Sequence, residues 1–490
     1  MGKSPTTKND FESVDLLIED FVAAYNVPGI SIAVVANDTS YRKSYGINSL
    51  DLGRELTDST LFFSGEISEL LVTTAILRLV QAQVIDLDDP IIKHLPYFYL
   101  QDSSYREITV RQILTSTSGI PSMGPALFTN LLYDSALTST TKSIQELGLE
   151  FPPGTTYKKA PYGFDILADL IANVTSQSFE EHMKQDVLLP LGMVHSTFLL
   201  GDLNDQHLCQ PHEISNLVSH KTKEVHSYYP YNREHSGSSG LHSNPSELLQ
   251  WMKMILNDGR INERRFLKKD LVKEFLNPQF KIGVNQYTGL STLIERDEER
   301  TLLITKTSSG FGFESSLILV PRYGFGIIVQ ANVPLPSEMP IAQIVTDYYS
   351  HRVESLDFAK IPVAVPMGQA YVDHGLDSAY AVYSRCKKEN PRRYDISAEA
   401  LFLLTERIRD FSVDTPEFTS EMCNMIALLE FTLSEYPNSL QGLTYLAEAY
   451  LLINDTAHFK KYLDMAIAQS DSDTSVLNHL NQIRMMANHN

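Results

Sequence analysis

The chain has 490 residues, of which 43% are hydrophobic, and its formal net charge is −20. This length and composition predict a globular protein of roughly two to four domains. The acidic excess argues against nonspecific binding to nucleic acid or to an anionic membrane surface, because phosphate groups would be repelled rather than neutralised.

The N-terminal sequence MGKSPTTKNDFESVDLL lacks the apolar segment of a secretory signal. No apolar run approaches the ~20 residues that cross a bilayer. We therefore expect a cytoplasmic protein with no membrane partner and no nucleic-acid partner. A periplasmic or secreted location is the alternative if a leader has been removed. The cysteines, Cys209, Cys386 and Cys423, are scattered and indicate neither a disulfide framework nor a zinc site.

The first two-thirds of the chain alternates between helical and strand-like segments. Residues 11–25 have apolar side chains at helical spacing, and the following VPGISIAVV predicts a buried strand after a Pro-Gly break. Residues 61–98 predict the end of a strand and then a helix that stops at DLDDP. Strand-like segments return at 287–331, as in SSLILVP and GFGIIVQAN. We therefore predict a mixed α/β domain over residues 1–335.

The remaining third predicts a different organisation. Five prolines fall between residues 333 and 368, which favours a linker, placed at 336–364. Residues 365–490 are predicted to be an all-α domain. Part of it resembles tetratricopeptide repeats, through Leu446, Ala447, Tyr450, Phe459, Leu463, Ala466 and Asp471. Such repeats commonly bind a protein partner. The alternative is a helical hairpin that caps the main domain.

Seven ordered segments between residues 11 and 335 carry a second resemblance. They are VPGISIAVV, AILRLVQAQVIDLDDPIIKHLP, ITVRQILTSTSGIP, FPPGTTY with GFDILADLI, LLPLGMVHSTF, SSGLHSNPSELLQWM and SSGFGFESSLILVPRYGFGIIVQAN. In this order and spacing they resemble the class C β-lactamases, penicillin-binding proteins and related esterases. The resemblance implies an α/β (α+β) domain whose core is a mixture of helices and antiparallel sheet.

The residues that carry chemistry in that family are replaced here. The family places Ser and Lys one helical turn apart, so that the amine can take the hydroxyl proton. The corresponding residues of this sequence are Glu66 and Glu69. The family's YxN motif corresponds to Lys159-Ala160-Pro161, flanked by Tyr157 and Tyr162. The family's KTG strand corresponds to Lys306-Thr307-Ser308. The ordinary acyl-enzyme mechanism is therefore not expected.

The replacements predict a cleft with charges of both signs. We expect the candidate catalytic residues Glu66, Glu69, Lys159 and Lys306 to face one another, with Thr307, Ser308 and Tyr162 binding a small-molecule ligand. Two carboxylates one turn apart disfavour double ionisation, so one can act as an acid and the other as a base. This predicts a lyase, isomerase, cyclase or other proton-transfer enzyme.

Two other functions are compatible with the same residues. The four charged side chains can form a salt-bridge plug in a catalytically dead binding or scaffold protein. The chain can also be a hydrolase with an unrecognised nucleophile. No cofactor or metal is expected, because the lysines oppose a cation at the ExxE pair. His235 and His242 flank the SSG segment and are expected near the cleft rim.

Overall fold

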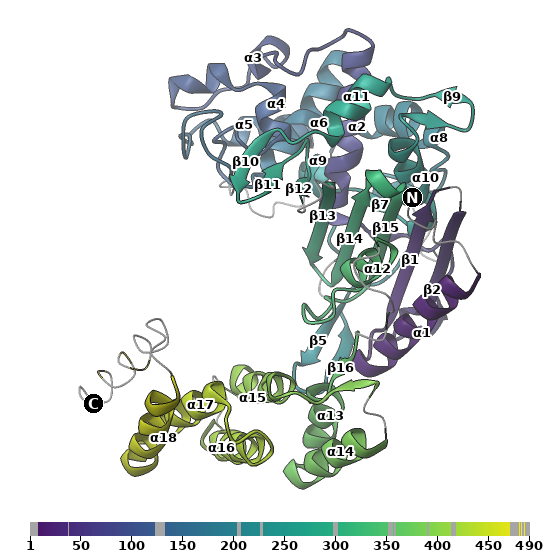
Figure 1. The fold of residues 1–490 in the computed structure, drawn as a ribbon. Helices are drawn as coiled ribbons and strands as arrows, with labels where there is room; N and C mark the ends of the chain where they lie inside the picture. The colour runs from purple at the N-terminus through teal and green to yellow at the C-terminus, as the bar shows by residue number, and fades with distance from the viewer. Residues whose placement is uncertain are drawn as a thin grey trace. The chain divides into compact units, whose positions relative to one another are not determined.

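The computed structural model describes most of the chain. The described residues are 8–37, 39–122, 133–202, 207–225, 229–296, 302–350, 356, 359–389, 392–412, 418–470, 480, 482 and 485. The chain divides into two compact units (Figure 1). Unit 1 comprises Met1–Val22, Val27–Glu213 and Lys223–Leu356, and unit 2 comprises Ala23–Asn26, Ile214–Thr222 and Asp357–Asn490.

A nine-stranded antiparallel sheet forms the centre of unit 1. In spatial order the strands are β10 (Phe280–Gly283), β11 (Gln286–Thr288), β12 (Leu293–Arg296), β13 (Leu302–Gly310), β14 (Phe313–Val320), β15 (Phe325–Ala331), β1 (Gly29–Ala36), β2 (Thr39–Ser49) and β3 (Arg54–Glu55). Strands β1 and β15 pair with Ile32 opposite Val329, so the sheet joins the two ends of the unit. Both strands are buried along their whole length, which explains their nearly continuous apolar sequences.

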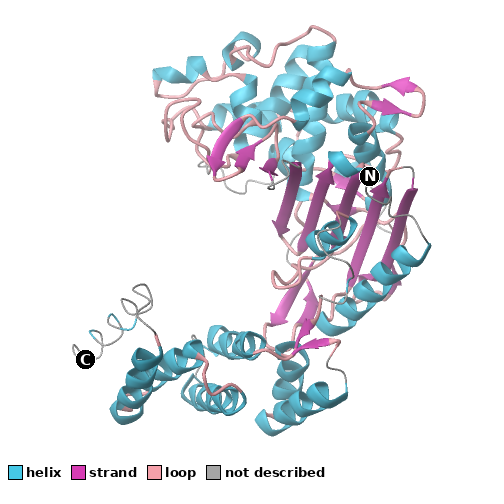
Figure 2. Cartoon of the chain, in the orientation of Figure 1, coloured by secondary structure: helices cyan, strands magenta, loops and turns pink. Residues whose placement is uncertain are grey.

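Helices cover both faces of this sheet (Figure 2). Side chains alternate between the faces of a strand. In β15, Phe325 stacks on Tyr349 of helix α12 (Ile341–Tyr349), with ring centroids 5.3 Å apart. On the other face, a side chain at Gly326 would meet Met252 of helix α10 (Pro245–Leu256). Helix α1 (Lys8–Tyr25) lies on the face of α12, because Phe11 stacks on Tyr41 and contacts Tyr349.

The helical part of unit 1 is built around helix α2 (Ser68–Gln81), which is buried along most of its length. The indole nitrogen of Trp251 on α10 donates to the hydroxyl of Thr74 on α2 at 2.9 Å. The surrounding helices are α3 (Ile91–His94), α4 (Val110–Leu114), α5 (Ala136–Ser143), α6 (Pro161–Thr175), α7 (Phe179–His182), α8 (Leu189–Leu191), α9 (Ser236–Ser239) and α11 (Lys269–Leu276). Short strand pairs of unit 1 are β4 (Phe62–Phe63) with β7 (His242–Ser243) and β8 (Arg260–Ile261) with β9 (Arg264–Arg265). The pair β5 (His212–Asn216) with β6 (Lys221–Glu224) contains Ile214–Thr222, which belongs to unit 2. The predicted mixed helix-and-antiparallel-sheet core is confirmed.

Unit 2 is mainly helical. Its helices are α13 (Ala364–His374), α14 (Leu376–Glu389), α15 (Ala398–Ser412), α16 (Phe418–Glu435), α17 (Leu440–Leu452) and α18 (Thr456–Gln469), with the parallel strand pair β16 (Ile361–Pro362) and β17 (Tyr394–Asp395). Helices α17 and α18 pack together through Leu446, Tyr450, Phe459 and Leu463, which share one buried core. Of the positions that carry the repeat resemblance, Asp471 lies outside the described residues.

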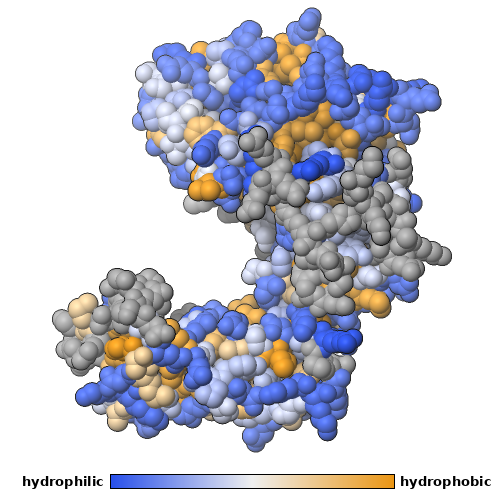
Figure 3. All heavy atoms as spheres, viewed as in Figure 1, coloured by the Kyte–Doolittle hydropathy of each residue, from blue (hydrophilic) through white to orange (hydrophobic). Residues whose placement is uncertain are grey.

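Helix α12 lies within residues 336–364, the segment that the sequence predicts as a linker. In the part of the chain that the structure describes, no helix combines the length and apolarity needed to cross a membrane. Hydrophilic residues cover much of the visible surface (Figure 3).

Candidate active site

The start of helix α2 is bound to strand β13 through a tight backbone turn. Gly65 has φ +53°, and a β-carbon on it would lie 2.1 Å from the Oγ atom of Ser308. A residue with a side chain would therefore be both strained and obstructed. The backbone N–H of Glu66 donates to the same Ser308 Oγ at 3.1 Å. Ser308 thus fills the space directly above the Gly65–Glu66 turn.

Glu69, in the first turn of α2, forms a buried ion pair with Lys306 of β13. The side chains of Glu69 and Lys306 are only 3% and 8% exposed. Burial raises the pKa of Glu69 to about 7, and the charge of Glu66 acts in the same direction, although Lys306 opposes them. The Lys306 ammonium also lies 5.8 Å from the centre of the Phe164 ring on α6. A carboxyl group with this pKa exchanges its proton near neutral pH.

A second, more open ion pair joins Glu66 to Lys159. Their side chains are 26% and 49% exposed. The pKa of Lys159 is raised, because the hydrogen bond and charge of Glu66 together have a larger effect than partial burial, which acts to lower it. The four charged residues expected in the cleft therefore lie together as an inner and an outer pair.

The inner pair opens onto a pocket of about 170 Å³. Its lining residues are Glu69, Leu114, Thr115, Ser116, Tyr157, Lys159, Thr288, Gly289, Ser291, Thr292, Leu293, Thr305, Lys306 and Thr307. Thr307 is therefore at the pocket, as expected, whereas Ser308 and Tyr162 are not among its lining residues. Tyr162 is buried with its ring edge-on to His235, 5.5 Å between centroids. Tyr157, on the other side of the Lys159 position, lines the pocket instead.

The β11–β12 segment of this lining was not predicted, because Thr288–Leu293 belongs to no recognised motif. Its main signal is an unusual run of hydroxyl residues, YTGLST. Thr115 and Ser116 belong to the segment ITVRQILTSTSGIP that carries the family resemblance. They reach the pocket at the end of α4, where the backbone turns and Ser116 adopts φ +55°.

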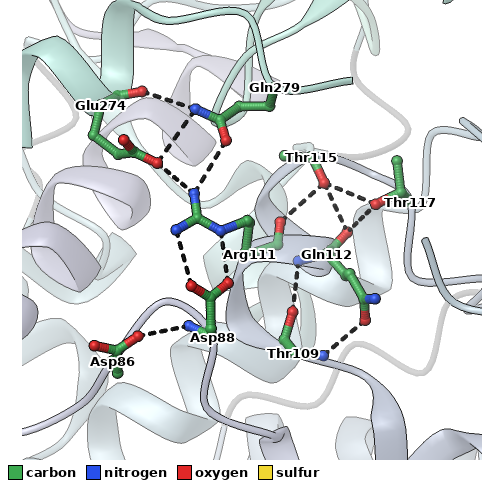
Figure 4. Close-up of polar contacts among 9 residues, drawn as sticks. All are labelled: Asp86, Asp88, Thr109, Arg111, Gln112, Thr115, Thr117, Glu274 and Gln279. Carbon is green, nitrogen blue, oxygen red and sulfur yellow. Dashed lines mark hydrogen bonds and ion pairs between the residues drawn. The ribbon is translucent and has the colours of Figure 1, made fainter. Parts of the chain in front are cut away.

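Arg111 on α4 ties together segments that support this pocket wall (Figure 4). Its guanidinium donates to both carboxylate oxygens of Asp88, at 2.7 and 3.2 Å. It also donates to Gln279 at 3.0 Å and pairs with Glu274 of α11. Gln279 leads into β10, and its backbone N–H donates to the carbonyl of Thr288 at 2.8 Å. The Arg111 contacts therefore fix the β11 side of the pocket relative to α4.

The part of the pocket wall around Ser291 is joined to α4 by a direct backbone hydrogen bond. The backbone N–H of Ser291 donates to the carbonyl of Leu114 at 2.7 Å. Thr115 donates its hydroxyl to the Arg111 carbonyl at 2.9 Å and lies 2.8 Å from the Thr117 hydroxyl (Figure 4). Both halves of the wall are thus held by hydrogen bonds that do not involve a ligand.

The two histidines near the SSG segment do not line the pocket. His235 lies 3.0 Å from the buried carboxylate of Asp165. His242 is fully buried, and burial lowers its pKa to about 4. Among the described residues, no group of three or more His, Cys, Asp or Glu side chains is placed to hold a metal ion.

Comparison with known proteins assigns this chain to a family. Residues 14–345 match the sequence profile described as Beta-lactamase. The chain belongs to the beta-lactamase family. The family resemblance predicted from the sequence is thereby confirmed.

The individual relatives are distant. "Protein flp" of Staphylococcus aureus (strain COL) is 26% identical over 329 residues, which cover 67% of this chain and 64% of that protein. The chain thus matches less than two-thirds of the length of this relative. "Penicillin-binding protein 4" of Amycolatopsis lactamdurans is 26% identical over 176 residues, 36% of this chain and 46% of that protein.

Solved structures show the same fold. The octameric penicillin-binding protein homologue from Pyrococcus abyssi superposes with a TM-score of 0.61 at 21% identity, over 74% of this chain and 82% of that chain. A class C beta-lactamase superposes with a TM-score of 0.59 at 20% identity, over 71% of this chain and 98% of that chain. These similarities establish the fold and leave the chemistry to be argued from the side chains.

Proposed function

We propose that this beta-lactamase-family domain is a non-hydrolytic enzyme that transfers protons to or from a small molecule bound beside Glu69. The observation that carries the proposal is that Glu69 is buried, lines the pocket and has a pKa raised to about 7. General acids and bases are most effective when their pKa lies near the working pH. A lyase, isomerase or cyclase reaction needs such a group and needs no acyl-enzyme.

The surroundings of Glu66 argue against acyl transfer. Acyl transfer requires N–H donors that are free to bind the oxygen on which negative charge develops. The N–H of Glu66 is already hydrogen-bonded to Ser308. Glu66 itself, at the position of the family's serine, is paired with Lys159.

The neighbouring serines are also engaged. Ser68 donates its hydroxyl to the Gly65 carbonyl at 2.6 Å and accepts from the Leu241 N–H at 2.9 Å. Ser64 accepts from the Gln330 amide at 3.0 Å. Both serines are fully buried. Neither is placed to attack a ligand in the pocket.

The proposed roles follow from burial. Glu69 exchanges the proton with the ligand, and Lys306 balances the charge of Glu69 when it is ionised. Glu66 and Lys159 form the more exposed pair, and Lys159 also reaches the pocket lining. Thr307 contributes a hydroxyl at the lining. A cytoplasmic location, and a protein partner for the helices of unit 2, are further parts of this proposal.

Solvent-proton exchange tests the proposed chemistry. The protein is incubated in D2O with a panel of small carbonyl and carboxylate compounds, and deuterium incorporation is followed by NMR. We expect incorporation into at least one compound, and we expect Glu69→Gln to abolish it. Glu66→Gln should reduce incorporation less, because Glu66 belongs to the more exposed pair and acts on Glu69 only through its charge. An acyl or phosphonyl adduct on a serine near α2 would instead establish a hydrolase.

A catalytically dead binding protein is the second candidate. It is favoured by the two ion pairs, because both carboxylates of the four-residue cluster, Glu66 and Glu69, already have a lysine as partner. In that case ligands would bind, yet no compound in the panel would exchange deuterium above the rate of the Glu69→Gln variant.

A further inference from the structure

A second pocket of unit 1, here called the α10 pocket, lies at the C-terminal end of helix α10. Its volume is about 450 Å³, within the ~300–1,000 Å³ of small-molecule sites. Its lining residues are Val35, Asn37, Gln250, Lys253, Met254, Leu256, Asn257, Arg260, Ile261, Asn262 and Gly324. None of them lines the pocket beside Glu69. Helix α10 and strand β9 lie on the other side of unit 1 from β10–β12 (Figure 1), so the two pockets are separate.

The charge of the α10 pocket is opposite to that of the chain as a whole. Its described lining residues include Lys253 and Arg260 but no Asp or Glu, although the formal net charge of the chain is −20. The segment 253–269 contains six Lys or Arg residues and two Asp or Glu residues. One of these two acids, Asp258, is paired with Lys269. Because salt screens charges beyond about 8–10 Å, a small ligand in this pocket is surrounded by positive charge.

Neither cation of the α10 pocket is paired with a carboxylate in the part of the chain that the structure describes. Lys253 donates to the hydroxyl of Ser40 at 3.1 Å, and Arg260 donates to the backbone carbonyl of Glu263 at 3.3 Å. Both acceptors are uncharged, so the positive charges of the two side chains are not offset. The lysines of the pocket beside Glu69 differ in this respect, because each is already paired with a glutamate.

The C-terminal end of α10 offers few free carbonyl groups that would repel an anion. The last carbonyls of a helix carry partial negative charge. Here the Lys253 carbonyl accepts from the Asn257 N–H at 2.9 Å, and the Met254 carbonyl accepts from the Gly259 N–H at 2.8 Å. The Asn257 carbonyl accepts from the Arg260 N–H at 3.0 Å. These bonds also hold strand β8, which carries Arg260, against the end of α10.

The rest of the lining combines apolar side chains with amides. Val35 and Met254 are buried, at 2% and 0% exposed. The amide side chains are those of Asn37, Gln250, Asn257 and Asn262. An amide group both donates and accepts hydrogen bonds, so it complements the hydroxyl groups of a sugar or the polar edge of a heterocycle. The lining therefore suits a ligand with an anionic group and a polar ring.

We propose that the α10 pocket binds a small phosphate monoester, with the phosphate between Lys253 and Arg260 and a polar ring against the amides. A phosphate monoester carries about −1.5 to −2 charges at pH 7, which two cations balance. Arginine binds phosphate oxygens through its planar fork, and lysine acts as a point charge. A nucleic acid or an anionic membrane would be repelled by the acidic chain, so a small ligand is favoured. This site is independent of the function proposed for the pocket beside Glu69.

Titration calorimetry with the full chain tests this assignment. The probes are AMP and glucose 6-phosphate, and each is compared with its uncharged counterpart, adenosine or glucose. Inorganic phosphate serves as the reference for an ion without a ring. We expect at least one monoester to bind at least about tenfold more tightly than its uncharged counterpart and than inorganic phosphate. Preference for AMP would indicate a nucleotide, and preference for glucose 6-phosphate a sugar phosphate.

Substitutions locate the ligand in the α10 pocket. Lys253→Met and Arg260→Gln should each weaken binding of the monoester by about tenfold, because each removes a charged donor. Arg264→Gln is the matched control, since Arg264 lies opposite Ile261 in the β8–β9 hairpin and carries the same charge but does not line the pocket. It should leave the affinity nearly unchanged. All three variants should melt at the temperature of the natural protein, because none of these side chains is buried.

The assignment is overturned if neither monoester binds, or if adenosine, glucose or inorganic phosphate binds as tightly as the monoesters. It is also overturned if Lys253→Met and Arg260→Gln keep full affinity. An equal loss of affinity in Arg264→Gln and Arg260→Gln would overturn it as well, because the effect would then come from the general charge of the surface.

Discussion

The backbone nitrogen of Glu66 lies 3.1 Å from the side-chain oxygen of Ser308, although 242 residues separate them in the sequence. This hydrogen bond connects the start of helix α2 to strand β13. It also uses the N–H group of Glu66, the residue predicted from the sequence to correspond to the family's serine. One contact thus both stabilises the entrance of α2 and removes a donor that acyl transfer would need.

Covalent labelling should therefore fail. After incubation with a fluorophosphonate or a penicillin, we expect the intact mass of the protein to be unchanged, because Glu66 is paired with Lys159 and both nearby serines are hydrogen-bonded. The reagent's activity is verified on an ordinary serine β-lactamase in parallel. A stoichiometric adduct on Ser64 or Ser68 would contradict the proposed function.

The Gly65 turn gives a second prediction. Gly65→Ala should lower the free energy of unfolding by more than the ~1–3 kcal/mol expected for strain at positive φ, because the new β-carbon meets Ser308. Gly53→Ala is the matched control, since Gly53 has φ +59° and no atom within 4 Å of the added carbon. Urea denaturation measures both variants.

Removal of the obstruction should rescue part of this loss. Gly65→Ala with Ser308→Gly removes the clash but leaves the Glu66 N–H without its acceptor, so the double variant should be more stable than Gly65→Ala and less stable than Gly53→Ala. Equal losses in the two single alanine variants would show that Ser308 yields without cost and does not restrict the turn.

The stability of the protein should depend on the ionisation of Glu69. Its pKa is about 7 in the folded protein and 4.5 in the reference state. Between these pH values the unfolded chain releases a proton that the folded chain keeps, so this group's contribution to stability falls as pH rises from about 4.5 to 7. In Glu69→Gln this decline should be absent. From pH 5 to pH 8 the free energy of unfolding of the variant should therefore rise by roughly 1–3 kcal/mol relative to that of the natural protein.

Denaturation curves at four pH values across this range measure the difference, and Glu66→Gln should show a weaker decline than the natural protein, because the charge of Glu66 contributes to the raised pKa of Glu69. The opposite result would be a free energy of unfolding of the natural protein that rises with pH relative to that of Glu69→Gln. It would indicate that the ionised pair stabilises the fold. That outcome would support the salt-bridge plug and the binding-protein candidate.

The two ion pairs should differ in their energetic importance. At pH 8, Lys306→Met should cost roughly 1–2 kcal/mol, because Glu69 loses its counter-charge and must take up a proton to stay buried. Lys159→Met should cost at most about 1 kcal/mol, since that pair is partly exposed. The double variant Lys306→Met with Glu69→Leu should recover much of the loss. Equal effects of the two single methionine variants would contradict the assignment of an inner and an outer pair.

Arg111 should be important for the pocket wall. Arg111→Ala removes the contacts to Asp88, Glu274 and Gln279, and we expect it to lower the free energy of unfolding by about 1.5–3 kcal/mol. It should also weaken ligand binding. Arg42→Ala is the control, because Arg42 and Asp58 form an ion pair in which both side chains are more than half exposed, at 55% and 53%. A loss of stability no greater than that of Arg42→Ala would show that the wall does not depend on Arg111.

The fold class and several of the helices and strands follow from local patterns in the sequence. The continuous apolar runs of β1 and β15 predict buried strands because both faces of these strands are covered. The helix predicted at 11–25 is confirmed as α1. Helix α12 was not predicted, since the prolines around it indicated a linker. Only its packing against β15, through Tyr349 and Phe325, makes that helix part of unit 1.

The sequence by itself determined the membership of the family, and it predicted that four charged residues lie in the cleft. The tertiary structure decided which charges pair, because Glu69 and Lys306 are 237 residues apart and meet only where the start of α2 lies against β13. It also decided that Tyr157 rather than Tyr162 lines the pocket, and that Thr288 and Thr292 belong to the site. The physical reason is that spacing along the chain reports the period of a helix or strand, whereas burial and pKa depend on neighbours that folding brings together.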